Sequence, residues 1–399
     1  MKIRLMAVAS TALLAAALAG CGSGSGSSSN GSGDDVYRVI VMGGVSAEGV
    51  LADQSQTSIA AAKASVDYAN ANGGVDGEKV TVTVIDDKSD PTTAVTKLRA
   101  AIAKQKPDLV LNSGPSTVAE ATLPILNQNH ILSMNIGPTE TSSDASKYPL
   151  NFDIAAGASE QLDAYASYFK EKGYKSVAIL HGNSAYGETF GSSAEKTLTA
   201  AGVKVTGNKE YDTTALDMTS QLEALESTDP DALVIDAYGA PLGYVLKGVA
   251  KLGWDIPMIG NTSVSATNLT GAKPPTGLVG TSEVKNLVMQ VPKSAKHDSS
   301  ATAVNAAVKG MLKYGEIKSS FVLAANYDAL PLVMAAADAA GSTDADKVAE
   351  KLVDSSVLKS AKTVIFPDYG FTSSVHAPQG VSGNYIFISP SVLKNGQFQ

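Results

Sequence analysis

Apolar and polar positions along the chain form two kinds of segment that alternate. Short runs typical of strands fall at residues 36–42, 80–85, 109–111, 131–135, 176–180, 203–205, 232–235, 257–259 and 385–389, and an extended stretch covers 277–284. Longer segments with helical spacing fall at residues 57–72, 92–106, 117–129, 159–172, 186–201, 215–227, 242–252, 303–314, 320–340 and 344–355. Strands that alternate with helices predict parallel sheets with helices on both faces.

The alternation occurs twice, over residues 36–135 and again over residues 159–259. Two such runs predict an α/β fold of two doubly wound parallel-sheet lobes. In open parallel sheets, ligands bind beyond the carboxyl ends of the strands. We therefore expect a ligand site in the cleft between the two lobes.

The first residues of the chain predict an export signal. Lys2 and Arg4 precede an apolar stretch at residues 5–18, and two small residues then lead to Cys21, the only cysteine. This order is typical of a secretory signal peptide. The four residues that end at Cys21 also resemble the lipobox of bacterial lipoproteins. That resemblance implies that residues 1–20 are removed and that Cys21 is lipidated; the alternative is an ordinary signal peptide with a chance cysteine.

Residues 21–35 are rich in Gly and Ser and predict a flexible tether. Together with a lipid on Cys21, the tether would hold the folded part at the extracytoplasmic face of the cell membrane. We expect no second membrane span, because the later apolar runs are short and interrupted by charges.

Composition narrows the class of protein. The 399 residues are 44% hydrophobic and carry a net charge of -8, so neither wholesale disorder nor a basic nucleic-acid surface is expected. The length fits two domains. A single cysteine excludes an intrachain disulfide and a zinc site built from several cysteines, and the four histidines include no HExxH motif. We expect no metal or nucleotide cofactor.

No catalytic motif occurs in the folded part. Ser184 lies near two glycines, but the second comes one residue too late for a G-x-S-x-G nucleophile elbow. A P-loop and a G-x-G-x-x-G fingerprint after the first strand are also absent. We interpret Asp86, Asp87 and Asp90 as a solvated strand end and turn. The chain is therefore predicted not to be an enzyme; the alternative is a lipoprotein hydrolase that uses Asp86, Asp87, Ser184 or His181.

Five stretches, in chain order, resemble motifs of one protein family. They are ASVDYANANGGVDG at residues 64–77, VIDDKSDP at 84–91, NSAYG at 183–187, LG with a later Pro at 252–257, and NYDA at 326–329. The family comprises the solute receptors of the branched-chain amino acid (Leu/Ile/Val) ABC transporters, which have the type I periplasmic-binding fold. The resemblance implies two lobes joined by a three-crossing hinge. Lobe 1 would hold residues 36–152 and 282–373, and lobe 2 would hold residues 153–281 and 374–399.

The same resemblance implies a substrate-binding lipoprotein that takes up a small carboxylate-bearing solute, such as a branched-chain or other amino acid. Its lobes would close over the solute by hinge bending, and the closed form would dock on the ABC permease subunits in the membrane. We expect a monomer that binds no nucleic acid. The alternatives are a receptor of the same fold for a small organic acid or amide, and a sensing receptor that reports to a signalling partner.

The resemblance assigns the solute carboxylate to the loop that follows the strand at residues 109–111. Ser116 and Thr117, with a lesser role for Ser113, would bind it through hydroxyls and backbone N–H groups, because a helix N-terminus presents free donors. Thr117 and Glu120 also form a capping box. One residue can cap the helix while its neighbour binds the solute.

Further candidates come from other strand ends. Thr139 and Asn135 follow the next strand of lobe 1. Tyr186 and Tyr238 would line the site from lobe 2, since tyrosine combines a broad apolar face with a hydroxyl. Tyr327 begins a segment that reaches either the cleft or the core.

One loop departs from the pattern of the amino-acid-binding relatives. In those proteins the loop after the strand at residues 257–259 often carries an acid that pairs with the solute ammonium. Here residues 260–268 contain no Asp or Glu. A desolvated ammonium needs an anion or several acceptors, which Asn261 and Thr262, or Asp236 from the preceding strand end, could supply.

Overall fold

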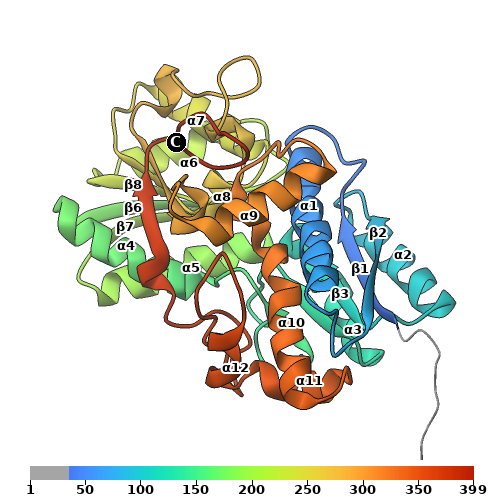
Figure 1. Ribbon diagram of the computed structural model, residues 1–399. Coiled ribbons are helices and arrows are strands. Elements are labelled where there is room, and N and C mark those ends of the chain that lie inside the picture. The colour runs from blue at the N-terminus through green and yellow to red at the C-terminus, as the bar shows by residue number, and fades with distance from the viewer. Residues whose placement is uncertain (1–35) are drawn as a thin grey trace, which may run out of the picture. The chain divides into compact units, whose positions relative to one another are not determined.

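Two separate β-sheets organise residues 36–399, the part of the chain that this computed structural model describes (Figure 1). The predicted signal peptide, Cys21 and the tether lie outside the described residues. The first sheet has the strand order β2-β1-β3-β4-β5 and is parallel throughout. Its strands are β1 (Val36–Gly43), β2 (Lys79–Asp86), β3 (Leu109–Asn112), β4 (Leu132–Asn135) and β5 (Asn151–Asp153).

Helices cover both faces of the first sheet, because the side chains of its interior strand β1 are apolar on both sides. The helices that follow its strands are α1 (Val50–Ala71), α2 (Pro91–Lys104) and α3 (Ser116–Gln128). Val39 and Val41 of β1 belong to the cluster that contains the buried face of α1. Ile40 and Met42, which alternate with them, belong to a second cluster with residues of α2 and α3. This alternation is the two-residue period of a strand buried on both faces.

The second sheet has the strand order β11-β10-β9-β8-β6-β7. Its strands are β6 (Ser176–Gly182), β7 (Lys204–Tyr211), β8 (Ala232–Ile235), β9 (Met258–Gly260), β10 (Leu287–Pro292) and β11 (Tyr385–Ile388). Only the β10–β11 pair is antiparallel. Its helices are α4 (Ala158–Lys172), α5 (Ala185–Ala200), α6 (Thr219–Glu226), α7 (Pro241–Leu252) and the single turn α8 (Thr262–Ser265). The prediction of two doubly wound α/β lobes is confirmed.

The remaining helices return to the first sheet. They are α9 (Thr302–Met311), α10 (Asn326–Ala340), α11 (Ala345–Leu352) and α12 (Ser355–Ser360). Helices α9 and α10 pack against α1, and Figure 1 shows α10 running beside it. We therefore use lobe 1 for the first sheet with α1–α3 and α9–α12, and lobe 2 for the second sheet with α4–α8.

The strand pairing corrects one predicted crossing between the lobes. The sequence analysis expects residues 277–284 to be extended, and its lobe bounds place a crossing within that stretch, near 281. Instead the strand is β10, which pairs in parallel with β9, so the chain leaves lobe 2 only after Pro292. The first crossing lies between β5 and α4. The third precedes β11, because Val375 and His376 still bond to lobe 1.

One described segment has the length and hydropathy of a membrane span. It is Phe321–Ala340, which joins a short 3-10 turn to α10. In the structure, 83% of its apolar window is buried inside the described unit. The segment is therefore accounted for as a core helix of lobe 1.

Candidate ligand-binding site

Apart from Tyr327, the predicted site residues of the described part lie at the carboxyl ends of the strands in both sheets. In lobe 1, Ser116 follows β3 and Thr139 follows β4; in lobe 2, Tyr186 follows β6 and Tyr238 follows β8. The two lobes touch at this level: the Tyr186 backbone N–H donates a hydrogen bond to Ser116 Oγ at 3.1 Å. The structure thus brings Ser116 and Tyr186 into direct contact.

Helix α3 begins with an open N-terminus. Its N-cap is Pro115, which provides no side-chain cap, and Ser116 is already the first helical residue. The first intrahelical bond runs from Val118 N–H to Pro115 O at 3.0 Å, so the N–H groups of Ser116 and Thr117 precede it. The capping box predicted for Thr117 and Glu120 is wrong, because Thr117 lies inside the first turn. These N–H groups are the donors that a helix N-terminus offers to an anion.

Two serine hydroxyls beside this helix start each accept a hydrogen bond from the protein and keep their own O–H free to donate. Ser113 Oγ accepts a hydrogen bond from Asn326 Nδ2 at 2.7 Å, and Ser116 Oγ accepts from the Tyr186 N–H. A hydroxyl that accepts a bond still has its own O–H to donate. The pair is therefore suited to oxygen acceptors such as a carboxylate.

Asn326 contacts the candidate donor Ser113, and the sequence analysis did not name it as a candidate. It is fully buried at the start of α10, and its amide also donates to Ser58 Oγ at 2.9 Å. Its neighbour Tyr327 was the predicted residue, but Tyr327 lies in the core against Tyr68 of α1, with ring centroids 6.1 Å apart. Burial raises the pKa of Tyr327 to about 12. The one signal in the sequence was that Asn326 begins the same NYDA stretch that carries the family resemblance.

Asn135 shapes the second loop of lobe 1 from inside. Its Nδ2 donates to Gly137 O at 2.8 Å and to Asp153 Oδ1 at 3.0 Å, and its Oδ1 accepts from Asn112 Nδ2 and Gly137 N–H, both at 2.9 Å. All four of its hydrogen-bonding positions are thus occupied by the protein. In this arrangement Asn135 supports the loop that carries Thr139.

Thr139 and Ser142 close that loop by a reciprocal pair of bonds. The Thr139 N–H donates to Ser142 Oγ at 2.8 Å, and Thr139 Oγ1 accepts from the Ser142 N–H at 3.0 Å. The loop also touches the start of α3 at Gly137, where an added Cβ would lie only 2.8 Å from the Ser116 nitrogen. Glycine at 137 therefore lets the two loops meet.

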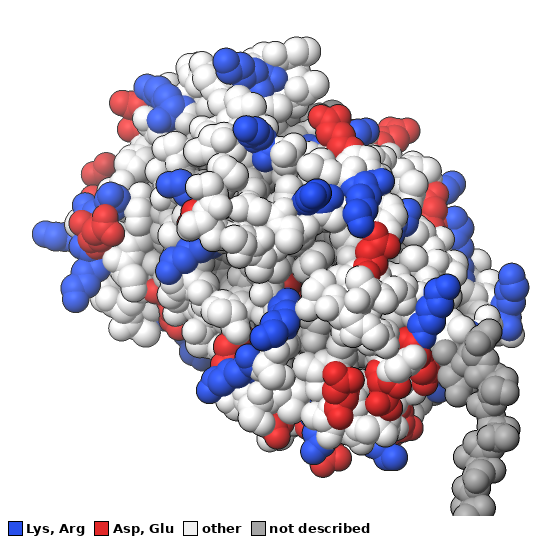
Figure 2. Space-filling model, viewed as in Figure 1, with Lys and Arg blue, Asp and Glu red and all other residues white. Residues whose placement is uncertain are grey.

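Neither loop contains a basic residue, so a solute here would be held by neutral donors. Residues 113–117 and 136–139 include no Lys or Arg. On the face shown in Figure 2, basic and acidic side chains are both scattered among uncharged residues, and neither sign covers the face.

On the lobe 2 side, the predicted tyrosines are largely enclosed. The Tyr186 ring packs on Phe190 with centroids 6.1 Å apart, and its hydroxyl is buried without a hydrogen-bond partner. Tyr238 is half-buried, and burial raises the pKa of its hydroxyl. The next residue, Gly239, faces Leu51 of α1 across the lobes. Tyr238 therefore lies at the junction, whereas the Tyr186 hydroxyl points into lobe 2.

Asn261 and Asp236 bond to each other rather than present free groups. Asn261 Nδ2 donates to Asp236 Oδ1 at 2.8 Å, and Asn261 Oδ1 accepts from the Ser263 N–H at 3.1 Å as the N-cap of α8. Thr262 Oγ1 donates to Gln161 Oε1 at 2.9 Å. Burial is the main cause that raises the pKa of the Asp236 carboxyl. The acid that could replace the missing ammonium partner is thus already paired with a neutral amide.

Two further polar contacts join the lobes, and the sequence analysis missed both. Asn268 Nδ2 donates to Asp53 Oδ2 at 2.9 Å, and Gln54 Nε2 donates to Ala266 O at 3.4 Å. Gln54 is 1% exposed. The sequence offers one signal for it, the polar run DQSQTS at residues 53–58.

A small cavity lies inside lobe 1 behind these loops. Its volume is about 10 Å³, and its lining includes the polar residues Asn112, Ser133, Asn135 and Asn151. That volume is close to the space of one water molecule. It is not a solute site.

The residues of the alternative hydrolase site have structural partners. Ser184 Oγ accepts from the Gly187 N–H at 3.0 Å as the N-cap of α5, and Asp86 Oδ2 accepts from Ser46 Oγ at 2.6 Å. His181 is buried, with its Nδ1 3.1 Å from Gly182 O. Asp90, outside that set, caps α2 through the Thr93 N–H at 2.7 Å. Asp87 is fully buried, which corrects its interpretation as solvated, and burial raises its pKa to about 6. Within the described residues, no group of three or more His, Cys, Asp and Glu side chains is placed to hold a metal ion.

Comparison with known proteins identifies similar chains. The family model described as periplasmic binding protein matches residues 44–380. The Leu-, Ile-, Val-, Thr- and Ala-binding protein of Pseudomonas aeruginosa is 24% identical over 320 residues, which are 80% of this chain and 82% of that protein. The Leu/Ile/Val-binding protein BraC3 of Rhizobium johnstonii is 26% identical over 308 residues, with 75% and 79% of the two chains covered.

Solved structures show the same fold. A type 1 periplasmic binding protein of Bordetella pertussis superposes with a TM-score of 0.76 at 20% identity over 92% of this chain and 99% of that one. A Rhodopseudomonas palustris ABC transporter solute-binding protein in complex with 4-hydroxybenzoate superposes with a TM-score of 0.67 at 19% identity, with 80% and 85% covered.

Proposed function

Because the chain belongs to the periplasmic binding protein family, we propose that it is an extracytoplasmic receptor for a small carboxylate-bearing solute. The donor set at the start of α3 carries this proposal. It consists of the hydroxyls of Ser113 and Ser116 and the first backbone N–H groups of the helix. Hydrogen bonds from such neutral donors to a charged carboxylate are stronger than bonds between neutral groups.

Lobe 2 would complete the site by closing on lobe 1. The Tyr186 N–H bond to Ser116 and the contacts of Asp53 and Gln54 with residues 266–268 support a closed arrangement. A solute shifts the balance towards closure only if it binds the closed form better than the open form. The closed form would then deliver the solute to the permease of an ABC importer; a sensing receptor would use the same closure to signal to a partner.

An amino acid is the first candidate solute, because the relatives reported above are named for amino acids. An organic acid without an amine is the second. It is favoured by the absence of Asp and Glu from residues 260–268 and by the burial of Asp236, which is 3% exposed and bonded to the Asn261 amide. The neighbour bound to 4-hydroxybenzoate shows that the fold accommodates such a compound.

We also propose that the protein is anchored through a lipid on Cys21 after removal of residues 1–20. The order of basic, apolar and small residues before the single cysteine supports this. Labelling of cells with a radioactive fatty acid should mark the wild-type chain and not the Cys21→Ser variant. Equal labelling of both would contradict the anchor.

A thermal-shift screen tests the solute class. The panel holds L-leucine, L-valine, L-threonine, 4-hydroxybenzoate and 3,4-dihydroxybenzoate, with calorimetry on every hit. A solute at 100 times its Kd stabilises the protein by about 2.7 kcal/mol. For lobes of about 150–200 residues that unfold separately, that is a rise in Tm of roughly 5–10 °C, and for a single transition of the whole folded part it is roughly 3–4 °C.

A matched variant links any hit to the proposed donors. The double variant Ser113→Ala/Ser116→Ala should lose the shift, whereas the exposed Ser300→Ala should keep it. No shift with any member of the panel would contradict a carboxylate receptor of this class. For the importer role, uptake of the hit solute by cells should require the wild-type chain and should not be restored by the double variant.

A further inference from the structure

Asp153 ends strand β5 at the first crossing between the lobes and is 0% exposed. Its carboxylate accepts three hydrogen bonds: from Ser142 Oγ at 2.6 Å, from Asn135 Nδ2 at 3.0 Å and from Asn151 Nδ2 at 3.2 Å. All three donors are neutral. A buried carboxylate without a cationic partner is costly, so its presence calls for a role that an apolar residue would not fill.

The partners of Asp153 hold the two proposed ligand-side loops of lobe 1. Asn135 binds both the N–H and the carbonyl of Gly137, and it accepts from Asn112, whose own side chain accepts from the Gly114 N–H at 3.0 Å. Ser142 accepts from the Thr139 N–H. One carboxylate therefore connects to the loop after β3 and the loop after β4.

The backbone of Asp153 connects the same point to the third crossing. Its N–H donates to His376 O at 2.8 Å, and the His376 N–H donates to Ser143 O at 2.8 Å. The His376 ring stacks on Phe152 with centroids 4.0 Å apart, and burial lowers its pKa. Of the residues that contact Asp153, His376 is the one titratable group, and it remains neutral at and above pH 7. The facing groups from β4, β5 and the loop at Ser142 are uncharged.

We propose that Asp153 is the positioning residue that ties both ligand-side loops of lobe 1 to the first and third crossings. The proposal rests on the proposed function only where it calls the loops ligand-side. Closure of the lobes and the shape of the carboxylate-binding loops would then depend on one buried side chain.

The Ser142 hydroxyl has one hydrogen and two acceptors within reach, which makes the arrangement sensitive to protonation. When Asp153 is ionised, Ser142 donates to Asp153, and Thr139 N–H, Ser142 and the carboxylate form one chain of bonds. When Asp153 takes up a proton from solvent, its O–H donates to Ser142 Oγ, and the Ser142 hydrogen turns to Thr139 O at 3.2 Å. The Thr139 N–H then loses its charge-assisted chain.

Both forms are populated near neutral pH, since burial raises the pKa of Asp153 to about 7. The folded-state pKa lies above the unfolded value of 3.8, so this carboxyl's contribution to stability is full below about pH 4 and is lost as the pH rises through 7. The loop behaves in the opposite sense: Thr139 is held more firmly above pH 7.

Amide hydrogen exchange of the whole protein without solute tests the proposal. Exchange is followed by mass spectrometry in peptides that span residues 136–145, at pH 5.5 and pH 8, and is divided by the rate of an unstructured peptide at each pH. In the wild type, protection should be roughly fivefold greater at pH 8, the difference between a charge-assisted and a neutral hydrogen bond. Asp153→Asn should show the pH 5.5 protection at both pH values, because its amide donates to Ser142 as the protonated acid does.

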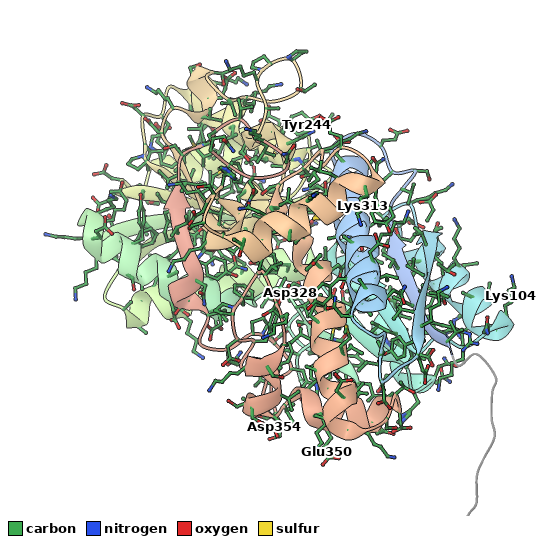
Figure 3. The ribbon with its side chains drawn as sticks, in the orientation of Figure 1. Lys104, Tyr244, Lys313, Asp328, Glu350 and Asp354 are labelled. Atoms are coloured by element: carbon green, nitrogen blue, oxygen red, sulfur yellow. The ribbon has the colours of Figure 1, made fainter. Side chains whose placement is uncertain are left out.

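Asp328→Asn is the matched control. Asp328, labelled in Figure 3, is equally buried in lobe 1 at the start of α10, and burial raises its pKa to about 7. It accepts from Val364 N–H, Ile365 N–H and Tyr369 Oη, so it holds a different loop. This variant should keep the pH dependence at residues 136–145.

The proposal is overturned if wild-type protection at residues 136–145 does not change with pH, or if Asp153→Asn retains the change. Asp153→Ala should lose protection there at both pH values; if it does not fold, Asp153→Asn decides. Because no solute is present, these outcomes stand even if every acid of the binding screen fails. If L-leucine or 4-hydroxybenzoate binds, its Kd should follow pH in the wild type and not in Asp153→Asn.

Discussion

The strand ends of the two lobes each contain a buried aspartate, but the two acids support different surroundings. Asp153 in lobe 1 holds, through Asn135 and Ser142, the loops that carry the proposed hydroxyl and backbone N–H donors. Asp236 in lobe 2 holds Asn261, which in turn caps α8, and its neighbours at the lobe junction are tyrosine rings. In both lobes the aspartate is buried beneath the candidate site and bonds to the residues that shape it.

This difference separates two tasks. Lobe 1 offers a prearranged set of donors, so it would recognise the carboxylate that all candidate solutes share. Lobe 2 offers enclosed tyrosine rings and an Asn261 amide whose polar atoms are already paired, so it would select the remainder of the solute by shape. Discrimination between an amino acid and an amine-free acid would then come from lobe 2.

The largest expected effect is the loss of the lobe 2 acid. Asp236→Ala should lower the free energy of unfolding by about 3 kcal/mol, because it leaves the buried Asn261 amide without its acceptor. Urea denaturation measures the change. Asp236→Asn, which keeps an acceptor oxygen, should cost less than half as much. An alanine variant as stable as the wild type would mean that the Asp236 carboxylate does not stabilise Asn261 and the start of α8.

The next effect concerns binding. Ser113→Ala should weaken the Kd of whichever of L-leucine and 4-hydroxybenzoate binds by roughly 10- to 100-fold, the worth of one hydrogen bond to a charged group. Ser58→Ala is the matched control, because Ser58, which lies on α1, accepts a hydrogen bond from the same Asn326 amide. It should change the Kd by less than about threefold. Equal losses from both variants would show that the Asn326 network, not a donor to the solute, sets the affinity.

The alternating fold was predictable because its signals are local. Helical spacing and short apolar runs mark most elements of both sheets, and each signal lies within a few residues. Strand β5 has three residues, and β10 follows a stretch that looked equally extended. Whether such a short segment forms a strand depends on the strands with which it pairs, and the local sequence does not reveal which strands those are.

The candidate site likewise contains some residues that local sequence indicates and others that only the folded structure brings together. Ser113, Ser116 and Thr117 were proposed because the family resemblance assigns the solute carboxylate to the loop after a strand, and that strand, loop and helix start follow one another directly in the sequence. The bond from Asn326 to Ser113 joins residues 213 positions apart, and the bond from Gln54 to Ala266 joins residues 212 apart. Contacts of that range depend on how the lobes and helices pack, so local pattern does not reveal them.

A smaller effect tests how tightly the two loops of lobe 1 meet. Gly137→Ala places a Cβ against the backbone nitrogen of Ser116 and should cost about 1–2 kcal/mol in solute binding as the loops separate. Calorimetry with the same probe solute measures it. Gly383→Ala meets nothing within 4 Å and should leave the Kd unchanged. If Gly137→Ala binds the solute as tightly as the wild type does, solute binding does not depend on the close contact between the two loops of lobe 1.

The smallest effect falls on the Tyr186 hydroxyl. Because this hydroxyl is buried without a partner, Tyr186→Phe removes no hydrogen bond, and the backbone N–H that reaches Ser116 is kept. Unfolding free energy should therefore change by less than about 0.5 kcal/mol, or rise slightly, and the Kd should stay within about twofold. A tenfold loss for 4-hydroxybenzoate but not for L-leucine would show that the phenol oxygen of the solute reaches Tyr186. Lobe 2 would then contribute polar recognition of its own, and the division between a donor lobe and a shape-selecting lobe would fail at this residue.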